Sequence, residues 1–148
     1  MPEARLCNNI SNFAVYTKIT KINFPENFAA DVDATGVDMT GWINNCTQYN
    51  SPVSINFKVK SFSITATSST NVPVPSIRLL NQSSTFTGST PQVDISGCKS
   101  MSVEAYNQLL TDLPSGLTGK TVKLPTICQT NGTDTSIGLN KNWSVIFG

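Results

Sequence analysis

The chain has 148 residues, which is the size of a single domain, and we expect residues 1–148 to share one continuous core. Only 13% of the residues are charged and the formal net charge is +1. The Lys and Arg residues are scattered in ones and twos, and no segment approaches the roughly 20 apolar residues of a membrane span. We therefore expect no nucleic-acid partner and no membrane insertion, while so low a charge also fits a homo-oligomer.

The chain contains no histidine, which excludes Ser-His-Asp and Cys-His catalytic groups and imidazole metal ligands within one chain. It also has no C-x-x-C pair of a zinc site and no glycine-rich phosphate loop. The sequence therefore predicts a protein that is not an enzyme and that holds no cofactor. Reduced, buried thiols are expected, with disulfides in an oxidising compartment as the alternative, at Cys7, Cys46, Cys98 and Cys128.

Residues 12–24 alternate apolar and polar side chains, first in phase with Phe13 and later in phase with Phe24 on the opposite parity. This pattern indicates one long strand with a bulge, or two short strands. We expect residues 1–28 to form a β-structured cap over the first edge of the fold, and the alternative is a segment that docks on a larger assembly. The first residues do not contain the apolar stretch of a signal peptide.

Carboxylates are concentrated between residues 31 and 38, where oxygen-bearing side chains alternate as they do in a calcium-binding loop. The twelfth position of such a loop needs a bidentate Glu, but here it is Trp42. We therefore expect no metal site, and the ligands of the weak surface calcium site that remains as an alternative are Asp31, Asp33 and Thr35. The simpler interpretation is a strand with Val32 and Ala34 inward and the aspartates solvated.

Short alternating runs predict three further strands, at residues 53–57, 62–67 and 77–80. The first two of these can pair as a hairpin through residues 58–61.

Two polar segments, residues 68–75 and 81–90, are the expected binding loops, because recognition usually lies in loops on a rigid scaffold. Two prolines in the first segment exclude a helix and a central strand. Phe86 stands alone among Ser, Thr and Gly, so it either anchors its loop to the core or is an exposed aromatic hot spot. The residues expected to contact a ligand are Asn71, Val74, Phe86 and Thr87.

The most regular part of the sequence predicts a strand, a helix and a second strand. The first strand contains Val93, and its alternating pattern returns at Val122, 29 residues later. Between them, apolar residues recur at three- and four-residue steps over residues 102–113, which predicts the one long helix. Leu110 lies on the apolar face of this helix and Asp112 on the polar face.

The ends of the predicted helix carry the expected signals. Ser100 or Ser102 can accept a hydrogen bond from the first turn, and Pro114 stops the helix. Farther along, a short helix is expected over residues 133–139, and residues 142–147 predict a final strand.

The pattern Val93-x-Ile95-x-x-Cys98 resembles the L-x-L-x-x-N/C signature of a leucine-rich repeat. The likeness is closest to the degenerate repeats of BspA-like bacterial surface proteins and of bacteriophage tail or other virion proteins. In such repeats aromatic and cysteine residues pack inward, and those places are held here by Trp42, Cys46 and Tyr49.

This resemblance implies a strand-rich α/β domain with an irregular leucine-rich-repeat-like stack over residues 29–148, one main helix at about 102–113, and the cap at 1–28. It implies a non-enzymatic structural or binding module, a component of a bacteriophage virion such as a tail, fibre or capsid-surface protein. The expected location is the virion, and the expected partners are other virion proteins or a host-surface ligand. The alternatives are a BspA-like adhesin on a bacterial cell surface and a carbohydrate-active enzyme.

Overall fold

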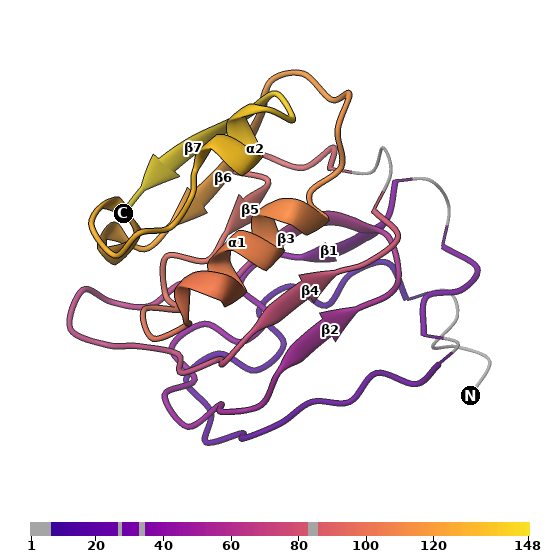
Figure 1. Cartoon of the computed structure of the whole chain (residues 1–148). Helices are drawn as coiled ribbons and strands as arrows, with labels where there is room; N and C mark the ends of the chain where they lie inside the picture. Colours follow the sequence, from indigo (N-terminus) through magenta and orange to yellow (C-terminus); the bar gives the residue numbers. More distant parts are fainter. Residues whose placement is uncertain (1–6, 27, 33–34, 83–85) are drawn as a thin grey trace.

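The computed structural model describes residues 7–26, 28–32, 35–82 and 86–148. Its largest element is a five-stranded sheet in which all neighbouring strands are parallel (Figure 1). The strands cross the sheet in the order in which they occur in the chain: β1 (Val37–Met39), β3 (Val59–Ser63), β5 (Val93–Asp94), β6 (Lys120–Leu124) and β7 (Trp143–Phe147).

Between successive strands of this sheet the chain crosses to a second layer and returns. We call one strand of the five-stranded sheet, with the return segment that follows it, one coil. The first two returns contain strands that form a separate parallel pair, and the later returns contain helices, so the expected strand-rich α/β class is confirmed. The return elements are β2 (Val53–Ile55), β4 (Ile77–Leu79), α1 (Val103–Asp112), and η2 (Thr126–Gln129) followed by α2 (Ser136–Leu139).

The register of the parallel strands follows the spacing of the sequence. Val93 lies opposite Val122, as the 29-residue spacing predicted, and Val122 lies opposite Val145. Phe62 extends the same row on the other side of Val93. Because side chains alternate along a strand, this row faces the core while the next row faces outward. The predicted strand, helix and strand are therefore confirmed together with their alignment.

Helix α1 forms where its capping and apolar signals agree. The Ser102 Oγ accepts a hydrogen bond from the Ala105 N–H (3.2 Å), which satisfies one free donor of the first turn. Tyr106, Leu109 and Leu110 form its buried face. The Tyr106 hydroxyl donates to the Cys98 carbonyl (2.6 Å), so the helix is fixed to the turn that follows β5.

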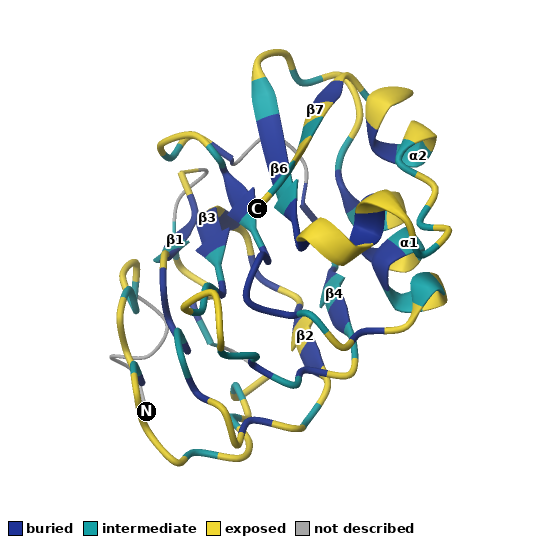
Figure 2. Ribbon diagram, turned by 90° about the vertical axis from the view of Figure 1, so that its left-hand side faces the viewer, coloured by how far each residue is buried: buried dark blue, intermediate teal, exposed yellow. Residues whose placement is uncertain are grey.

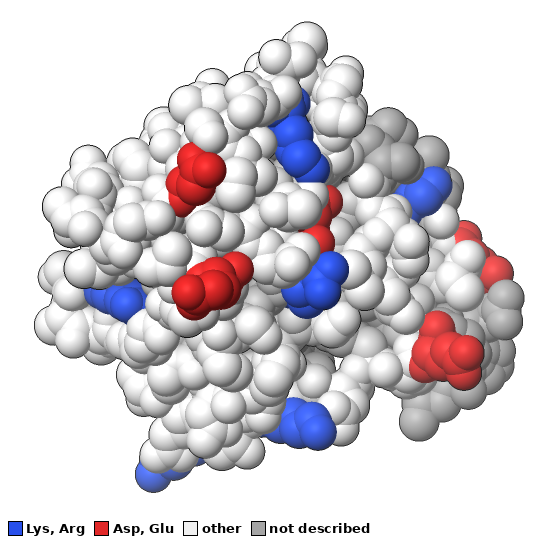
Figure 3. Space-filling view, in the orientation of Figure 1, with Lys and Arg blue, Asp and Glu red and all other residues white. Residues whose placement is uncertain are grey.

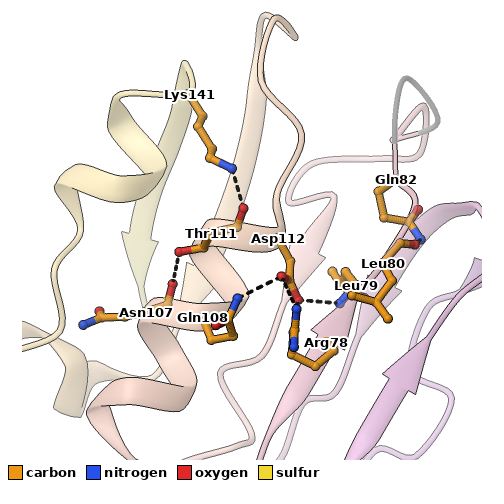
Figure 4. A network of polar contacts seen from close by, with 9 residues as sticks. All are labelled: Arg78, Leu79, Leu80, Gln82, Asn107, Gln108, Thr111, Asp112 and Lys141. Carbon is orange, nitrogen blue, oxygen red and sulfur yellow. Dashed lines mark hydrogen bonds and ion pairs between the residues drawn. The ribbon is translucent and has the colours of Figure 1, made fainter.

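The polar face of α1 is also in contact with the protein (Figure 4). The side chain of Asp112 is only 6% exposed, and its carboxylate accepts hydrogen bonds from the Arg78 Nε (2.6 Å) and Nη2 (3.0 Å) and from the Leu79 N–H (3.1 Å). The hydrogen bonds and charge of Asp112 raise the pKa of Arg78. Asp112 lies on the polar face, as predicted, but this part of the face is covered by protein because β4 packs beside that side of the helix.

The core lies between the two layers, where buried residues gather on the strands of both sheets and on the inner side of α1 (Figure 2). Trp42 and Tyr49 are fully buried, as the resemblance implied, with ring centroids 6.2 Å apart. Phe24, Phe28 and Phe57 extend this aromatic group toward the N-terminal segment. The core of the first coils therefore combines a group of aromatic rings with aliphatic side chains such as Ile43 and Ile55.

The N-terminal segment covers the edge of β1, as the predicted cap would, but it does so without the predicted strand structure. Its described part, residues 7–26 and 28, contains one isolated β-bridge, from Asn9 to Asp38, and no strand. The main-chain N–H groups of alternate residues from 10 to 16 instead donate to carbonyls of residues 38–44, at 2.8–3.0 Å. Asn12 and Tyr16 have positive φ values of 53° and 57°, and this left-handed backbone interrupts the alternation on which the strand prediction depended.

Two other strand predictions are wrong. Val32 lies in a turn and Ala34 lies outside the described residues, while the strand begins later, at Val37. Residues 53–57 and 62–67 do not form a hairpin, because β2 and β3 belong to different sheets. The buried Gln82 occupies the corner between these strands, where its Oε1 accepts from the Val59 N–H (3.0 Å) and its Nε2 donates to the Phe57 carbonyl (2.6 Å).

The four cysteines are free thiols. Cys7 is half-buried and the other three are buried, and burial raises the pKa of Cys98 and of Cys128. Cys46, Cys98 and Cys128 each donate a main-chain hydrogen bond to the carbonyl three residues earlier (2.9–3.3 Å). They therefore lie in similar turns in different coils, and the Cys46 thiol also donates a hydrogen bond to the Ala14 carbonyl. No helix in the described part of the chain is long and apolar enough to cross a membrane.

Candidate functional site

The structure separates the four residues that were expected to contact a ligand. Val74 and Phe86 are fully buried, so neither is an exposed contact. The Phe86 ring packs edge-on against Trp143, with centroids 5.2 Å apart, and this anchors its loop to the last strand. Asn71 is half-buried and uses both ends of its amide within the protein: Oδ1 accepts from the Lys99 N–H (2.7 Å) and Nδ2 donates to the Ser100 Oγ (3.0 Å). Thr87 is exposed.

The acidic segment offers no assembled metal site in the residues that the structure describes. Asp31 and Thr35 are exposed, and Asp33 lies outside the described residues. In the described part of the chain, no three His, Cys, Asp or Glu side chains gather closely enough to hold a metal ion.

A groove of about 300 Å³ lies on the outward face of the five-stranded sheet, between that face and the loop that leads into β5. The floor of the groove consists of residues of β1, β3 and β5 and of Thr40, which follows β1. Its wall is formed by residues 88–91, at the end of the predicted binding loop 81–90. Most of its side chains carry hydroxyl, carboxylate or ammonium groups, at Asp38, Thr40, Lys60, Ser61, Ser63 and Asp94.

A hydrogen-bond network fixes the floor of the groove. The Asp38 Oδ1 accepts from the Ser61 Oγ (2.9 Å) and from the Thr40 N–H (3.0 Å), and the Thr40 and Ser61 hydroxyls lie 2.7 Å apart. Burial opposes ionisation of Asp38, but the hydrogen bonds from Thr40 and Ser61 outweigh it, so the pKa of this carboxyl is lowered from its ordinary value of 3.8. Asp38 is therefore ionised at neutral pH and held in one orientation.

The wall of the groove is equally constrained. The Gly88 N–H donates to the Lys60 carbonyl (3.0 Å), and a Cβ at this glycine would lie 2.8 Å from the Ser61 Cβ. Only glycine permits so close an approach to β3. The buried Gln92 then links the loop to the sheet, since its Nε2 donates to the Gly88 carbonyl (3.2 Å) and its Oε1 accepts from the Thr121 N–H (2.8 Å).

The groove is suited to hydrogen bonding with a polar ligand. Carboxylate oxygens accept hydrogen bonds, the ammonium group of the exposed Lys60 donates them, and the hydroxyls do both. Because the network and the wall are formed without a ligand, binding would require little ordering of the protein. An ionised Asp38 with a lowered pKa is a weak general base, and it carries no proton to donate as a general acid.

A second depression, of about 340 Å³, lies beside Trp42 and the segment that contains Ile22 and Phe24. Its lining includes no Lys, Arg, Asp or Glu. Burial raises the pKa of Tyr49, whose hydroxyl accepts from the Ile22 N–H at 3.4 Å. Its polar side chains, on Asn23, Tyr49, Ser54 and Asn56, are uncharged, so this depression offers no fixed charge to orient a ligand and is the weaker candidate.

The sequence did not identify the floor of the groove. Asp94 was not expected to bind a ligand, and Asp38 was noted only as part of an acidic segment. A signal was present in the repeated pattern Asp-x-Thr/Ser, because the Oδ1 of Asp38 and of Asp94 accepts from the N–H two residues later. The pattern occurs in two different coils, and its aspartates belong to the row of side chains that faces outward from the sheet.

The face shown in Figure 3 has no cluster of positively charged side chains. On this face the Lys and Arg side chains lie apart from one another, separated by uncharged surface or, near the centre, by an Asp or Glu side chain. Comparison of the chain with protein-family models, with curated proteins and with solved structures finds no match.

Proposed function

We propose that this chain is a non-enzymatic binding module of a bacteriophage virion, located in a tail, a fibre or the capsid surface, and that it recognises a host-surface ligand through the groove. The observation that carries the proposal is the preformed polar groove, whose floor spans β1, β3 and β5 and whose wall is held by Gln92. Preformed concave sites with a few fixed polar groups are typical of ligand recognition.

The leucine-rich-repeat likeness of residues 29–148 belongs to the same proposal. It is supported by the alignment of Val93 with Val122, and by Cys98, which is buried in the turn after β5 as the repeat signature requires. In this interpretation the groove lies on the strand face of the repeats, and their return elements form the opposite face.

The charge of the chain supports a virion or cell-surface setting rather than a nucleic-acid partner. With 13% charged residues, the exposed surface relies on Asn, Ser and Thr, whose hydrogen bonds are insensitive to the ionic strength outside a cell. Contacts with other virion proteins would use the remainder of this neutral surface.

The second candidate is a BspA-like adhesin on a bacterial cell surface. The specific observation in its favour is the segment in which Trp42, Cys46 and Tyr49 are all fully buried, as the resemblance to BspA-like repeats implied. Both candidates use the same groove, and they differ in where the protein is located. Mass spectrometry of purified phage particles separates them, because a virion component is recovered with the capsid proteins.

The binding proposal is tested with fluorescently labelled chain and with bacterial envelope polysaccharides and whole host cells as probes. The variants Lys60→Ala and Asp38→Asn alter the groove, and Lys58→Ala is the matched control, because Lys58 is exposed on the same segment but does not line the groove. We expect both groove variants to bind at least about tenfold more weakly than the wild type, which corresponds to about 1.4 kcal/mol, and the control to bind normally.

Unfolding midpoints of all three variants are measured in parallel, so that a loss of binding is not confused with a loss of folding. Absence of binding to every host-surface probe, or equal binding by the control and both groove variants, would contradict the proposal.

A further inference from the structure

One edge of the five-stranded sheet is covered by another segment of the chain, and the other edge is open. The edge of β1 is covered by the N-terminal segment: the Asp38 N–H donates to the Asn8 carbonyl (2.9 Å), and the Ile10 N–H donates to the Asp38 carbonyl (2.9 Å). β7 is the last strand at the other edge, and no described segment pairs with its outer side. This open strand is the outermost strand in Figure 1.

The register of β7 shows which main-chain groups face the open side. Leu124 lies opposite Phe147, and the Gly148 N–H donates to the Leu124 carbonyl (3.0 Å). Because N–H and C=O groups alternate in direction along a strand, those of Ser144 and Ile146 are also directed toward β6. The N–H and C=O groups directed toward the open side are therefore those of Trp143, Val145 and Phe147.

The side chains at this edge provide none of the usual protection. Natural edge strands are blocked by charged residues, prolines or bulges, and β7 contains no charged residue and no proline. Lys141 is close in sequence, but its Nζ donates to the Leu113 carbonyl (2.6 Å), so its charge lies against the end of α1. Ile146 and Leu139 are exposed beside the edge, to 41% and 54%.

We propose that β7 pairs with β7 of a second copy of this chain, antiparallel and about a two-fold axis that passes midway between Val145 of the two copies. In this register Val145 faces Val145 of the second copy, and Trp143 faces Phe147 of the second copy. All the outward main-chain groups then meet outward groups, because the hydrogen-bonded positions of an antiparallel pair are alternate residues. The result is one continuous sheet through both molecules.

A second copy fits this edge better than a charged partner does. The strand is uncharged and the whole chain carries a net charge of only +1, so the symmetric contact brings no like charges together. A head-to-tail contact is disfavoured, because the covered edge is interrupted by the left-handed residues Asn12 and Tyr16 and offers no regular strand. The symmetric, closed contact is therefore favoured.

The test is the mass of the chain in solution, measured by sedimentation equilibrium over a wide range of protein concentration. We expect the wild type to approach twice 15.9 kDa as its concentration rises. Ile146→Lys places a charge on the edge, and Val145→Pro removes an outward N–H while leaving the bonds to β6 intact. Both variants should sediment as monomers of 15.9 kDa with native circular dichroism.

The matched control is Phe13→Lys, which adds the same charge at an exposed apolar residue near the covered edge. This variant should remain dimeric. Amide exchange of Val145 should also be slow in concentrated wild type and fast in Ile146→Lys. A wild type that stays at 15.9 kDa at every concentration, or a control that dissociates as readily as Ile146→Lys, would overturn the inference. If Val145→Pro does not fold, Ile146→Lys alone decides the outcome.

Discussion

The coils that return through strands and those that return through helices use the same five-stranded sheet but close their cores in different ways. In the first type, β2 and β4 pair with each other and the core includes aromatic rings such as Trp42 and Phe57. In the second, α1 buries Leu109 and Leu110. The difference shows that any return segment with apolar side chains and a suitable length can cover the sheet. The local sequence of the segment decides whether it is a strand or a helix.

The two types of coil meet at one place. β4 packs beside α1, and Asp112 joins them by accepting from the Arg78 side chain and from the Leu79 N–H. Parallel pairing cannot continue from β4 to a helix, so a side chain replaces it. The carboxylate takes the place that the carbonyl of a further strand would hold.

The largest effects should come from truncating a core side chain in either type of coil. Leu110→Ala on α1 and Leu79→Ala on β4 should each lower the free energy of unfolding by about 2–5 kcal/mol, because both side chains are buried. Denaturant unfolding measures both losses. Thr111→Ala, at an exposed helical position, is the control and should change stability by less than about 0.5 kcal/mol. Two separate unfolding transitions, with each substitution shifting only one of them, would show that the coils unfold independently.

Asp112, which joins β4 to α1, should be the position where a substitution has the next largest effect on stability. Asp112→Ala leaves the Leu79 N–H without its acceptor and should cost about 1–3 kcal/mol in urea unfolding. Asp112→Asn keeps an acceptor at this place and should cost less. If the two substitutions are equally harmless, the side chain does not connect the two types of coil.

The smallest effect should be the pH dependence due to Asp38, in the first coil. Its folded-state pKa is lowered from 3.8, so the ionised form stabilises the fold above the unfolded pKa, and this contribution is lost as the pH falls through the folded pKa. The contribution should stay below about 1 kcal/mol because the carboxylate is partly exposed. Wild type and Asp38→Asn are compared in urea from neutral to strongly acidic pH. Their midpoints should differ near neutrality and converge in acid, and a constant difference would assign the stabilisation to another group.

The fold could be predicted where local signals and coil spacing agree. Ser102, the apolar face of α1 and the 29-residue step to Val122 all specify the same strand, helix and strand, and the structure confirms each of them. The N-terminal segment could not be predicted in this way. Asn12 and Tyr16 have left-handed backbone in a segment whose alternate N–H groups, theirs included, donate to residues 38–44, and such pairing leaves no trace in the local alternation.

The candidate site was predicted less well than the fold, for a related reason. Asp38 and Ser61 are 23 residues apart and meet only because a return through β2 places β3 beside β1. Their partnership depends on the length of that return, which the sequence does not reveal before the strands are known. The position of Phe86 also depends on a distant part of the sequence. This residue is an anchor of its loop and not an exposed hot spot, because it packs on Trp143 in the last strand of the sheet.

The spacing of the hydrogen bonds between coils has a consequence for how the chain folds. Asn71 with Ser100, Gln92 with Thr121 and Pro114 with Trp143 are each separated by 29 residues. Every such contact closes a loop of similar length, so each costs similar chain entropy, and no step requires the two termini to meet. Folding can therefore begin at the unit with the strongest local preferences, β5–α1–β6, and spread in both directions by adding one neighbour at a time.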